Sequence, residues 1–375
     1  MYHLLLTIAI LTAHAGGKRG LHGMGNFLSG RMSLSERAPT RMPWPRLQRC
    51  MIASLLGAVF ACNIASAQDK GSINPEPLPP LAHPEDPKLP AKELFGRKTT
   101  PAALQTHTIG FYAKGCLAGG VALPVNGKTW QVMRVSRNRN WGHPSLVEFL
   151  ERLADQASTT GWRGLLLGDM SQPRGGPMRN GHASHQVGLD ADIWLTPMPD
   201  HELTRVEREE MMATLIVRPD GKDIDPKVWT PAHVALIKAA AEDPHVARIF
   251  VNAAIKKALC RDAGKDRKWL SKVQPWWGHD WHFHVRLSCP SEDPECKPQP
   301  PRPADEGCGA KELDHWMLKG VEKPKQDAKP DAKPAITASA ATTPPATTAS
   351  TASKGRPGPR MADLPAACRQ VLLAP

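Results

Sequence analysis

The sequence predicts an α+β fold, a single domain over residues 106–320 with a central antiparallel sheet flanked by helices. Two observations indicate this fold. Segments in which apolar residues recur at helical spacing alternate along the chain with short segments that have the pattern of strands. No segment recurs at a fixed period, so the sequence does not indicate a repeat architecture.

One helix and two strands are predicted in the first half of this domain. Residues 143–158 are expected to form a helix, because their leucines and Phe149 recur at helical spacing and Pro144 suits the first turn. The apolar segment 164–170 predicts a buried strand. Residues 189–195 alternate strictly between apolar and polar, which predicts a strand with one apolar face.

The second half of the domain supplies two helices and two strands. Residues 230–243 predict a helix that is capped by Thr230, and residues 252–260 predict a shorter one. Residues 246–251 are expected to form a strand between them. Residues 281–287 alternate between apolar and polar side chains, which again indicates a strand with two different faces.

The N-terminal residues 1–67 are predicted to be an over-extended start followed by a secretory signal peptide. The basic residues 41–49 precede the apolar segment "MIASLLGAVFACNIASA", whose small final residues suit cleavage after Ala67. A membrane anchor is the alternative, but the apolar segment is short for a span, so no stable membrane insertion is expected. The mature chain would begin with a Pro-rich arm over residues 68–105.

The C-terminal part is predicted to be a linker that leads to a tethered segment. Residues 321–360 are rich in Pro, Ala, Thr and Lys and cannot build a core. Residues 361–375 contain Cys368, and a cysteine at the far end of such a linker suggests a disulfide to the domain.

Composition restricts the partners and the compartment. A net charge of +12 permits a polyanionic partner, but the chain has no zinc-finger spacing and no aromatic RNA-recognition signature, so nucleic acid is not expected. An even number of cysteines after the signal favours disulfides in an exported protein, although spacing alone does not fix their pairing. These cysteines are Cys116, Cys260, Cys289, Cys296, Cys308 and Cys368.

Two histidine clusters predict a metal site. In "WWGHDWHFHVRL" (276–287), His282 and His284 point to the same face of the strand, roughly 6.5–7 Å apart at the backbone. One ion cannot easily take both side chains, so this spacing suggests one ligand and one base that reaches a metal-bound water. In "GHASHQVGLDAD" (181–192), His185 can fold from its loop toward Asp192 on the adjoining strand. With His284, this set of two imidazoles and one carboxylate suits zinc with an open fourth position.

Several strings together resemble the penicillin-insensitive murein endopeptidases. The resemblance covers residues from about 110 to 316 and resumes at Cys368, and its motifs are "GHASHQVGLDADIWL", "GHDWHFHVRLSCP", "GHPSLVEFLERL", "GDMSQPRGG", "ARIFVNAAIKKALC" and "QVMRV". This family consists of periplasmic zinc enzymes of the lysostaphin and D-Ala-D-Ala metallopeptidase superfamily. The resemblance therefore implies the periplasm as the location of this protein.

The resemblance assigns roles to the histidines and aspartates. His185, Asp192 and His284 would hold the zinc, and His282 would act as general base on the zinc-bound water. His182 would be associated with the metal, and His279 would orient another group or contact substrate.

A second metal contact and the disulfide pairing are also implied by the resemblance. Asp220 and Asp223 match a metal-contact pair of the family, although a turn explains Asp220 equally and Asp223 replaces a family histidine. The implied disulfides are Cys116–Cys368, Cys260–Cys308 and Cys289–Cys296.

The expected function is hydrolysis of the amide between D-alanine and meso-diaminopimelate in the cross-links of peptidoglycan. A D,D-carboxypeptidase or a non-catalytic peptidoglycan-binding protein is the alternative. Arg174, Arg179 and Arg286 are candidates for binding the carboxylates of the stem peptides, although ordinary surface charge explains them as well.

Overall fold

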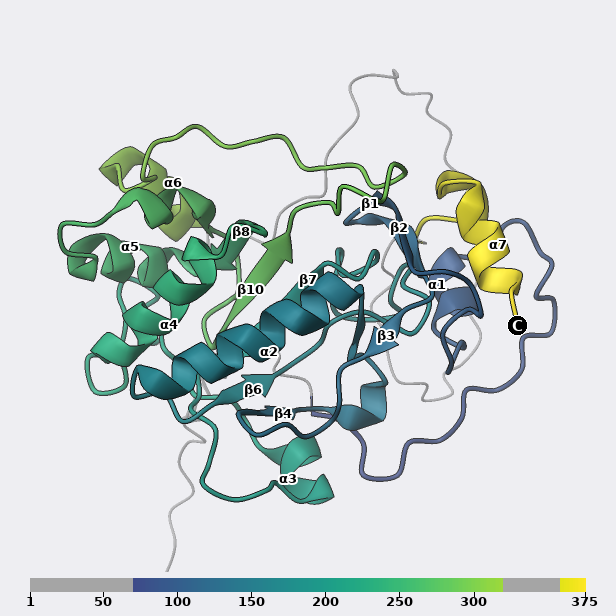
Figure 1. Ribbon diagram of the computed structural model, residues 1–375, viewed down its shortest axis with the longest axis horizontal. Coiled ribbons are helices and arrows are strands. Elements are labelled where there is room, and N and C mark those ends of the chain that lie inside the picture. The colour runs from purple at the N-terminus through teal and green to yellow at the C-terminus, as the bar shows by residue number, and fades with distance from the viewer. Residues whose placement is uncertain (1–69, 320–357) are drawn as a thin grey trace, which may run out of the picture. The chain divides into compact units, whose positions relative to one another are not determined.

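A six-stranded sheet forms the centre of the computed structural model, which describes residues 70–319 and 358–375 (Figure 1). The strand order is β4-β6-β7-β10-β8-β9. These strands span Trp130–Val132 (β4), Leu165–Leu167 (β6), Asp190–Trp194 (β7), His282–Leu287 (β10), Val246–Val251 (β8) and Val273–Pro275 (β9). With seven α-helices among the described residues, the fold is α+β.

The sheet is antiparallel at its centre and parallel at both edges. β10 pairs antiparallel with β7 and β8, and β6 pairs antiparallel with β7. The outer pairs β4–β6 and β8–β9 are parallel. The prediction of an antiparallel sheet therefore holds only for the centre. The edge pairs are parallel because a helix connects the two strands of each pair. Helix α2 (Pro144–Thr159) lies between β4 and β6 in the chain, and α5 (Ala253–Asp262) lies between β8 and β9. Crossovers of this kind join parallel strands.

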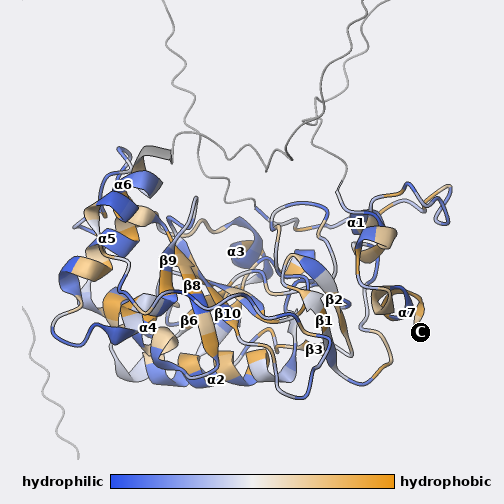
Figure 2. Cartoon of the chain, turned by 90° about the horizontal axis from the view of Figure 1, so that it is seen from above, coloured by the Kyte–Doolittle hydropathy of each residue, from blue (hydrophilic) through white to orange (hydrophobic). Residues whose placement is uncertain are grey.

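Helices α2 and α4 (Pro231–Glu242) cover one face of the sheet, as the view in Figure 2 shows. The alternation along β7 and β10 explains this packing. Ala191 and Ile193 of β7 and Phe283 and Val285 of β10 are fully buried in the same core cluster as the apolar residues of both helices. The polar residues of these strands therefore lie on the opposite face.

The remaining elements surround this sheet. The other α-helices are α1 (Ala91–Phe95), α3 (Arg205–Glu210), α6 (Ala310–Lys319) and α7 (Ala367–Leu373). The other strands are β1 (His107–Phe111), β2 (Lys114–Ala118), β3 (Val121–Ala122) and β5 (Trp141–Gly142), and the 3₁₀ helices are η1 (Val135–Arg137), η2 (Lys268–Lys272) and η3 (Met361–Asp363).

A second core attaches the C-terminal segment to the domain. The Cys116–Cys368 disulfide joins β2 to α7 across 252 residues of sequence. The buried guanidinium of Arg174 also donates to carbonyl groups at the end of α7, among them that of Val371 at 3.1 Å. Phe95 of α1 is buried in the same cluster, so the predicted arm over residues 68–105 contains a short helix. The other two disulfides are Cys260–Cys308 and Cys289–Cys296, so all three pairs are those that the resemblance implied.

Several predicted segments lie outside the described residues. They are the signal peptide within residues 1–67 and the linker over residues 321–360, of which only residues 358–360 are described. Within the part of the chain that the structure does describe, no helix combines the length and apolar character needed to cross a membrane.

Candidate metal centre

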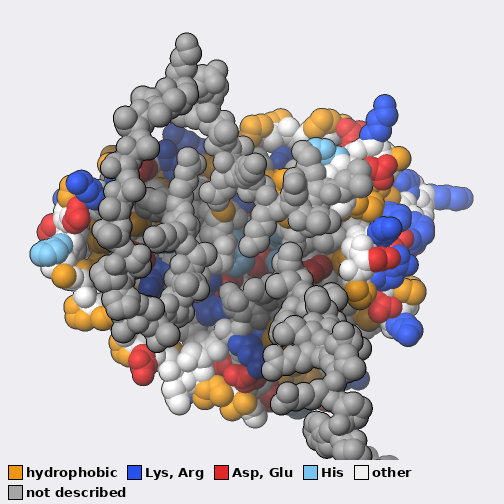
Figure 3. Space-filling model, turned by 180° about the vertical axis from the view of Figure 1, so that it is seen from behind, with side chains coloured by type: hydrophobic (Ala, Val, Ile, Leu, Met, Phe, Trp, Pro, Cys, Tyr) orange, Lys and Arg blue, Asp and Glu red, His pale blue; other side chains and the backbone are white. Residues whose placement is uncertain are grey.

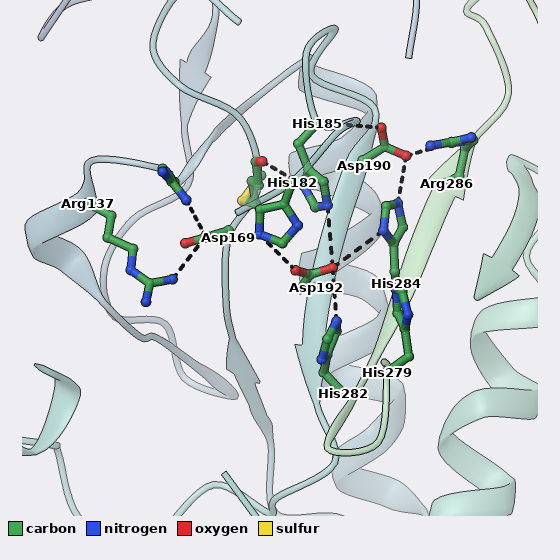
Figure 4. Close-up of polar contacts among 12 residues, drawn as sticks. Arg137, Asp169, His182, His185, Asp190, Asp192, His279, His282, His284 and Arg286 are labelled. Atoms are coloured by element: carbon green, nitrogen blue, oxygen red, sulfur yellow. Dashed lines mark hydrogen bonds and ion pairs between the residues drawn. The ribbon is translucent and has the colours of Figure 1, made fainter. Parts of the chain in front are cut away.

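The site is built on the polar faces of β7 and β10. In the antiparallel register, His284 lies opposite Asp192 and Arg286 lies opposite Asp190. Because alternate residues share a face, both aspartates and all three polar side chains of β10 lie side by side on the face that α2 and α4 leave uncovered (Figure 4).

A loop before β7 brings two more histidines over this face. His185 adopts a left-handed backbone conformation with φ of 64°, which is unusual for a residue other than glycine. Two contacts hold it: its backbone N–H donates to Asp190 Oδ2 at 3.1 Å, and its Nδ1–H donates to the Met170 carbonyl at 2.7 Å. With Nδ1 committed to a carbonyl, Nε2 of His185 is left with a lone pair for a metal.

Asp192 is the point on which the histidines converge (Figure 4). Its Oδ1 atom lies 3.4 Å from His185 Nε2, 3.6 Å from His284 Nδ1 and 3.6 Å from His282 Nε2. Its Oδ2 atom lies 3.4 Å from His182 Nε2. The surrounding histidines hold the pKa of this buried carboxyl well below its usual value, although burial alone would raise it.

The buried polar atoms at this point fit a cation. His185 Nε2 and Asp192 Oδ1 are buried and have no hydrogen bond. Buried polar atoms are nearly always hydrogen-bonded, so two such atoms facing each other indicate that a third group belongs between them. Imidazole nitrogens and a carboxylate oxygen form a typical donor set for zinc.

The tightest group of potential ligands differs from the predicted set by one residue. Among the described residues, His182, His185 and Asp192 offer ligand atoms that all lie within 4.8 Å of one another. The predicted set contained His284 in place of His182. His284 nevertheless faces Asp192 from the neighbouring strand, so the structure brings all four residues together.

Asp190 orients two members of the site. Its Oδ1 atom accepts from His284 Nε2 at 2.8 Å and from Arg286 Nε at 2.7 Å. The first bond leaves His284 Nδ1, the atom that faces Asp192, unprotonated. Burial lowers the pKa of His284 to about 4, so its imidazole is neutral at pH 7. Although burial opposes ionisation of Asp190, Arg286 and His284 lower the pKa of its carboxyl.

Asp169 is a site residue that sequence reasoning did not assign. Its buried Oδ2 accepts from Arg139 at 2.8 Å, from Arg137 at 3.1 Å and from His182 Nε2 at 3.1 Å. Despite burial, these contacts lower the pKa of Asp169 strongly. The available signal was its position just after the buried strand β6, because the ends of strands often carry site residues. Asp190 had a clearer signal, since it alternates with Asp192 on the same strand.

His282 and His279 lie where the site opens to a cavity of about 830 Å³. The two imidazole rings are 4.8 Å apart, and both residues line the cavity together with His182 and Asp192. Burial lowers the pKa of His282 well below its usual value, so this side chain is neutral. Figure 3, seen from behind relative to Figure 1, shows histidine and acidic side chains on this face.

Asp220 and Asp223 form ion pairs with basic side chains instead of joining the histidines. Asp220 is exposed and lies 2.6 Å from Arg218, whereas Asp223 lies 3.0 Å from Lys257 and 3.3 Å from Arg261. Neither aspartate is part of the group of ligand atoms found among the described residues, nor of the cavity lining. Their role as a second metal contact stays a prediction.

The three arginines proposed for binding carboxylates have different positions. Arg174 is buried against α7, and Arg286 is buried against Asp190 and the ring of Tyr112. Arg179 lines the cavity, where its Nε lies 3.2 Å from Glu93. Only Arg179 of the three is thus placed to meet a ligand in the cavity.

Comparison with known proteins shows the family of this chain. Residues 108–373 match the family described as penicillin-insensitive murein endopeptidase. A protein of that name from Klebsiella pneumoniae subsp. pneumoniae is 46% identical over 235 residues, which cover 63% of this chain and 84% of the relative. A protein of the same name from Haemophilus influenzae is 47% identical over 224 residues, which cover 58% of this chain and 77% of the relative. Another from Escherichia coli O1:K1 is 44% identical over 243 residues, which cover 64% of this chain and 88% of the relative. The chain belongs to the penicillin-insensitive murein endopeptidase family.

Proposed function

We propose that this protein is a zinc endopeptidase of the periplasm that hydrolyses the D-alanyl–meso-diaminopimelyl cross-links of peptidoglycan. Membership of the family supports the substrate class. The observation that carries the proposal is the convergence of imidazole nitrogens on the Oδ1 atom of Asp192, which has no hydrogen bond and belongs to a residue that lines a cavity of about 830 Å³.

The residues that would hold the zinc are His185, Asp192 and His284, with His182 close enough to replace one of them. When bound in such a site, zinc lowers the pKa of a water molecule to about 7 and polarises an amide carbonyl. Met170 and Asp190 keep the liganding nitrogens of His185 and His284 unprotonated. Hydrolysis at such a centre requires no acylated serine, which agrees with insensitivity to penicillin.

His282 is the candidate general base. Its Nε2 lies 3.6 Å from Asp192 Oδ1, so it borders the proposed metal position. Its other ring nitrogen, Nδ1, has no hydrogen bond, whereas a carbonyl and a carboxylate fix the second nitrogens of His185 and His284. A neutral imidazole at this position can take a proton from the attacking water and return it to the leaving amine. Arg139 and Arg179 line the same cavity and offer guanidinium groups for the carboxylates of stem peptides.

The test is to incubate the chain from Gln68, the predicted mature start, with purified cross-linked muropeptide dimers and to follow products by mass. Conversion to monomers that a chelator blocks and penicillin does not would support the proposal. Release of single alanines would instead indicate a carboxypeptidase. A folded, zinc-loaded protein that cleaves nothing would favour a binding protein.

A further inference from the structure

The N-terminal arm contributes one side of the cavity that contains the proposed metal site. Lys70, Gly71, Ser72, Pro75 and Glu76 line this cavity together with His182, Asp192, His279 and His282. These arm residues precede the family match, which begins at residue 108. Figure 1 draws the arm in purple, from near β4 round to α1. A segment outside the family region therefore borders the proposed active site.

The arm is attached to the wall of the cavity by a small set of contacts. The Gly71 N–H donates to the Glu209 carbonyl at 3.0 Å, and the Ser72 N–H donates to Ser136 Oγ at 2.9 Å. Ser136 Oγ in turn donates to Glu209 Oε2 at 2.8 Å. Lys70 adds an exposed ion pair with Glu210, and exposed pairs of this kind contribute little. Further along, Arg97 Nε donates to the Pro79 carbonyl at 3.3 Å. Such a segment can be released without disturbing the core.

The fit of the arm on the wall depends on the absence of a side chain at Gly71. A Cβ atom at this position would collide with Glu209 Oε2 and come within 2.8 Å of Ser136 Oγ. Glu209 is buried and accepts a second hydrogen bond from the Ser136 N–H at 2.8 Å, so its side chain has little freedom to move aside. Any larger residue at position 71 should therefore lift the arm from the wall.

We propose that residues 70–76 form a strap that restricts entry of polymeric peptidoglycan to the cavity. The inference rests on the proposed function for its substrate. A small muropeptide dimer can enter beside the strap. A glycan strand within the intact wall, in contrast, must lie across the rim of the cavity that the strap occupies. Glu76 adds a carboxylate to the cavity that contains the proposed metal site, so the docked strap places a negative charge where an acidic ligand would approach.

The test compares the chain from Gln68 with a chain that begins at Pro77. If the strap is docked about nine-tenths of the time, its removal raises kcat/KM on intact sacculi about tenfold. Cleavage of the soluble dimer should change much less. Equal or slower cleavage of sacculi by the shortened chain would overturn the proposal, since it would mean that the arm is irrelevant or helps to bind substrate.

A second variant serves if the shortened chain fails to fold. Gly71→Ala should release the strap and raise sacculus cleavage in the same direction, while Gly309→Ala is the matched control because a Cβ there meets nothing within 4 Å. Hydrogen exchange at the Ser72 amide, which donates to Ser136 Oγ, provides a readout that does not need turnover, and it should accelerate in Gly71→Ala and stay constant in Gly309→Ala. An unchanged exchange rate in Gly71→Ala would refute the strap. If no form cleaves either substrate, the proposed function fails, but the exchange rates still decide whether the arm is docked on the wall of the cavity.

Discussion

Replacing Asp190 with asparagine tests whether this buried carboxylate prepares His284 for the metal. The carboxylate accepts three hydrogen bonds: from His284 Nε2 and Arg286 Nε on Oδ1, and from the His185 N–H on Oδ2. Asparagine has the same shape but only one acceptor atom. If its oxygen faces His284 and Arg286, its NH₂ group meets the N–H donor of His185.

The structure sets the expected magnitudes. The unsatisfied N–H of His185 should lower the free energy of unfolding by about 1–3 kcal/mol. Loss of the negative charge also makes His284 a weaker donor to the metal, and removal of such an orienting partner usually reduces metal affinity about 10- to 100-fold. Asp190→Asn should therefore fold, be moderately less stable and bind zinc more weakly.

The assay is a competition titration with a zinc-binding dye, together with urea unfolding of the metal-free protein. Asp293→Asn is the matched control. Asp293 is also buried, accepts the Thr108 N–H at 2.7 Å and lies 3.2 Å from His107 Nδ1, but it is not part of the proposed metal site. It should lose stability and keep its zinc affinity. If Asp190→Asn bound zinc as tightly as the wild type, the role assigned to Asp190 would be wrong.

Three further predictions follow from the same contacts. His282→Ala should keep zinc and lose most turnover, whereas His185→Ala should lose both. The exposed His201→Ala should lose neither, and a metal-free His282→Ala would contradict the division between ligand and base. Burial lowers the pKa of His233 to about 4, so the unfolded chain binds its proton first as pH falls. This stabilising contribution is complete above pH ~6.5 and lost toward pH ~4, up to roughly 3 kcal/mol. Urea unfolding at several pH values should show a flatter profile for His233→Gln, and an unchanged profile would exclude the effect. Finally, the chain-entropy model predicts about twice the loss of stability for Cys116→Ala/Cys368→Ala as for Cys289→Ala/Cys296→Ala, because the closed loops span 252 and 7 residues. Equal losses in thermal unfolding would contradict that account.

Local patterns in the sequence were sufficient for most of the secondary structure. Helix α2 begins after His143 and α4 after Thr230, where Pro144 and Pro231 occupy the first helical position. The strict alternation in β7 and β10 also assigned the correct residues to the apolar and polar faces, because side chains alternate along any strand. The motifs of the family marked the residues that gather at the site.

The sequence did not determine how these segments pair. Parallel pairing at the edges of the sheet depends on crossovers through α2 and α5, which local alternation does not encode. The contact between His284 and Asp190 joins residues that are 94 positions apart, and its register follows from the pairing of two whole strands. For the same reason, local sequence could not show that the ligand atoms of His182, rather than those of the predicted His284, lie in the tightest group with His185 and Asp192.

The sequence by itself determined the alternation of helices and strands, the polar faces of β7 and β10, and the family. Each of these depends on residues that are close in the chain or on motifs that can be recognised directly. Only the tertiary structure decided that Asp190 orients His284, that Asp169 holds His182, and that residues 70–76 border the cavity. These relations join segments that are distant in sequence, and they are fixed by the packing and register of the whole domain.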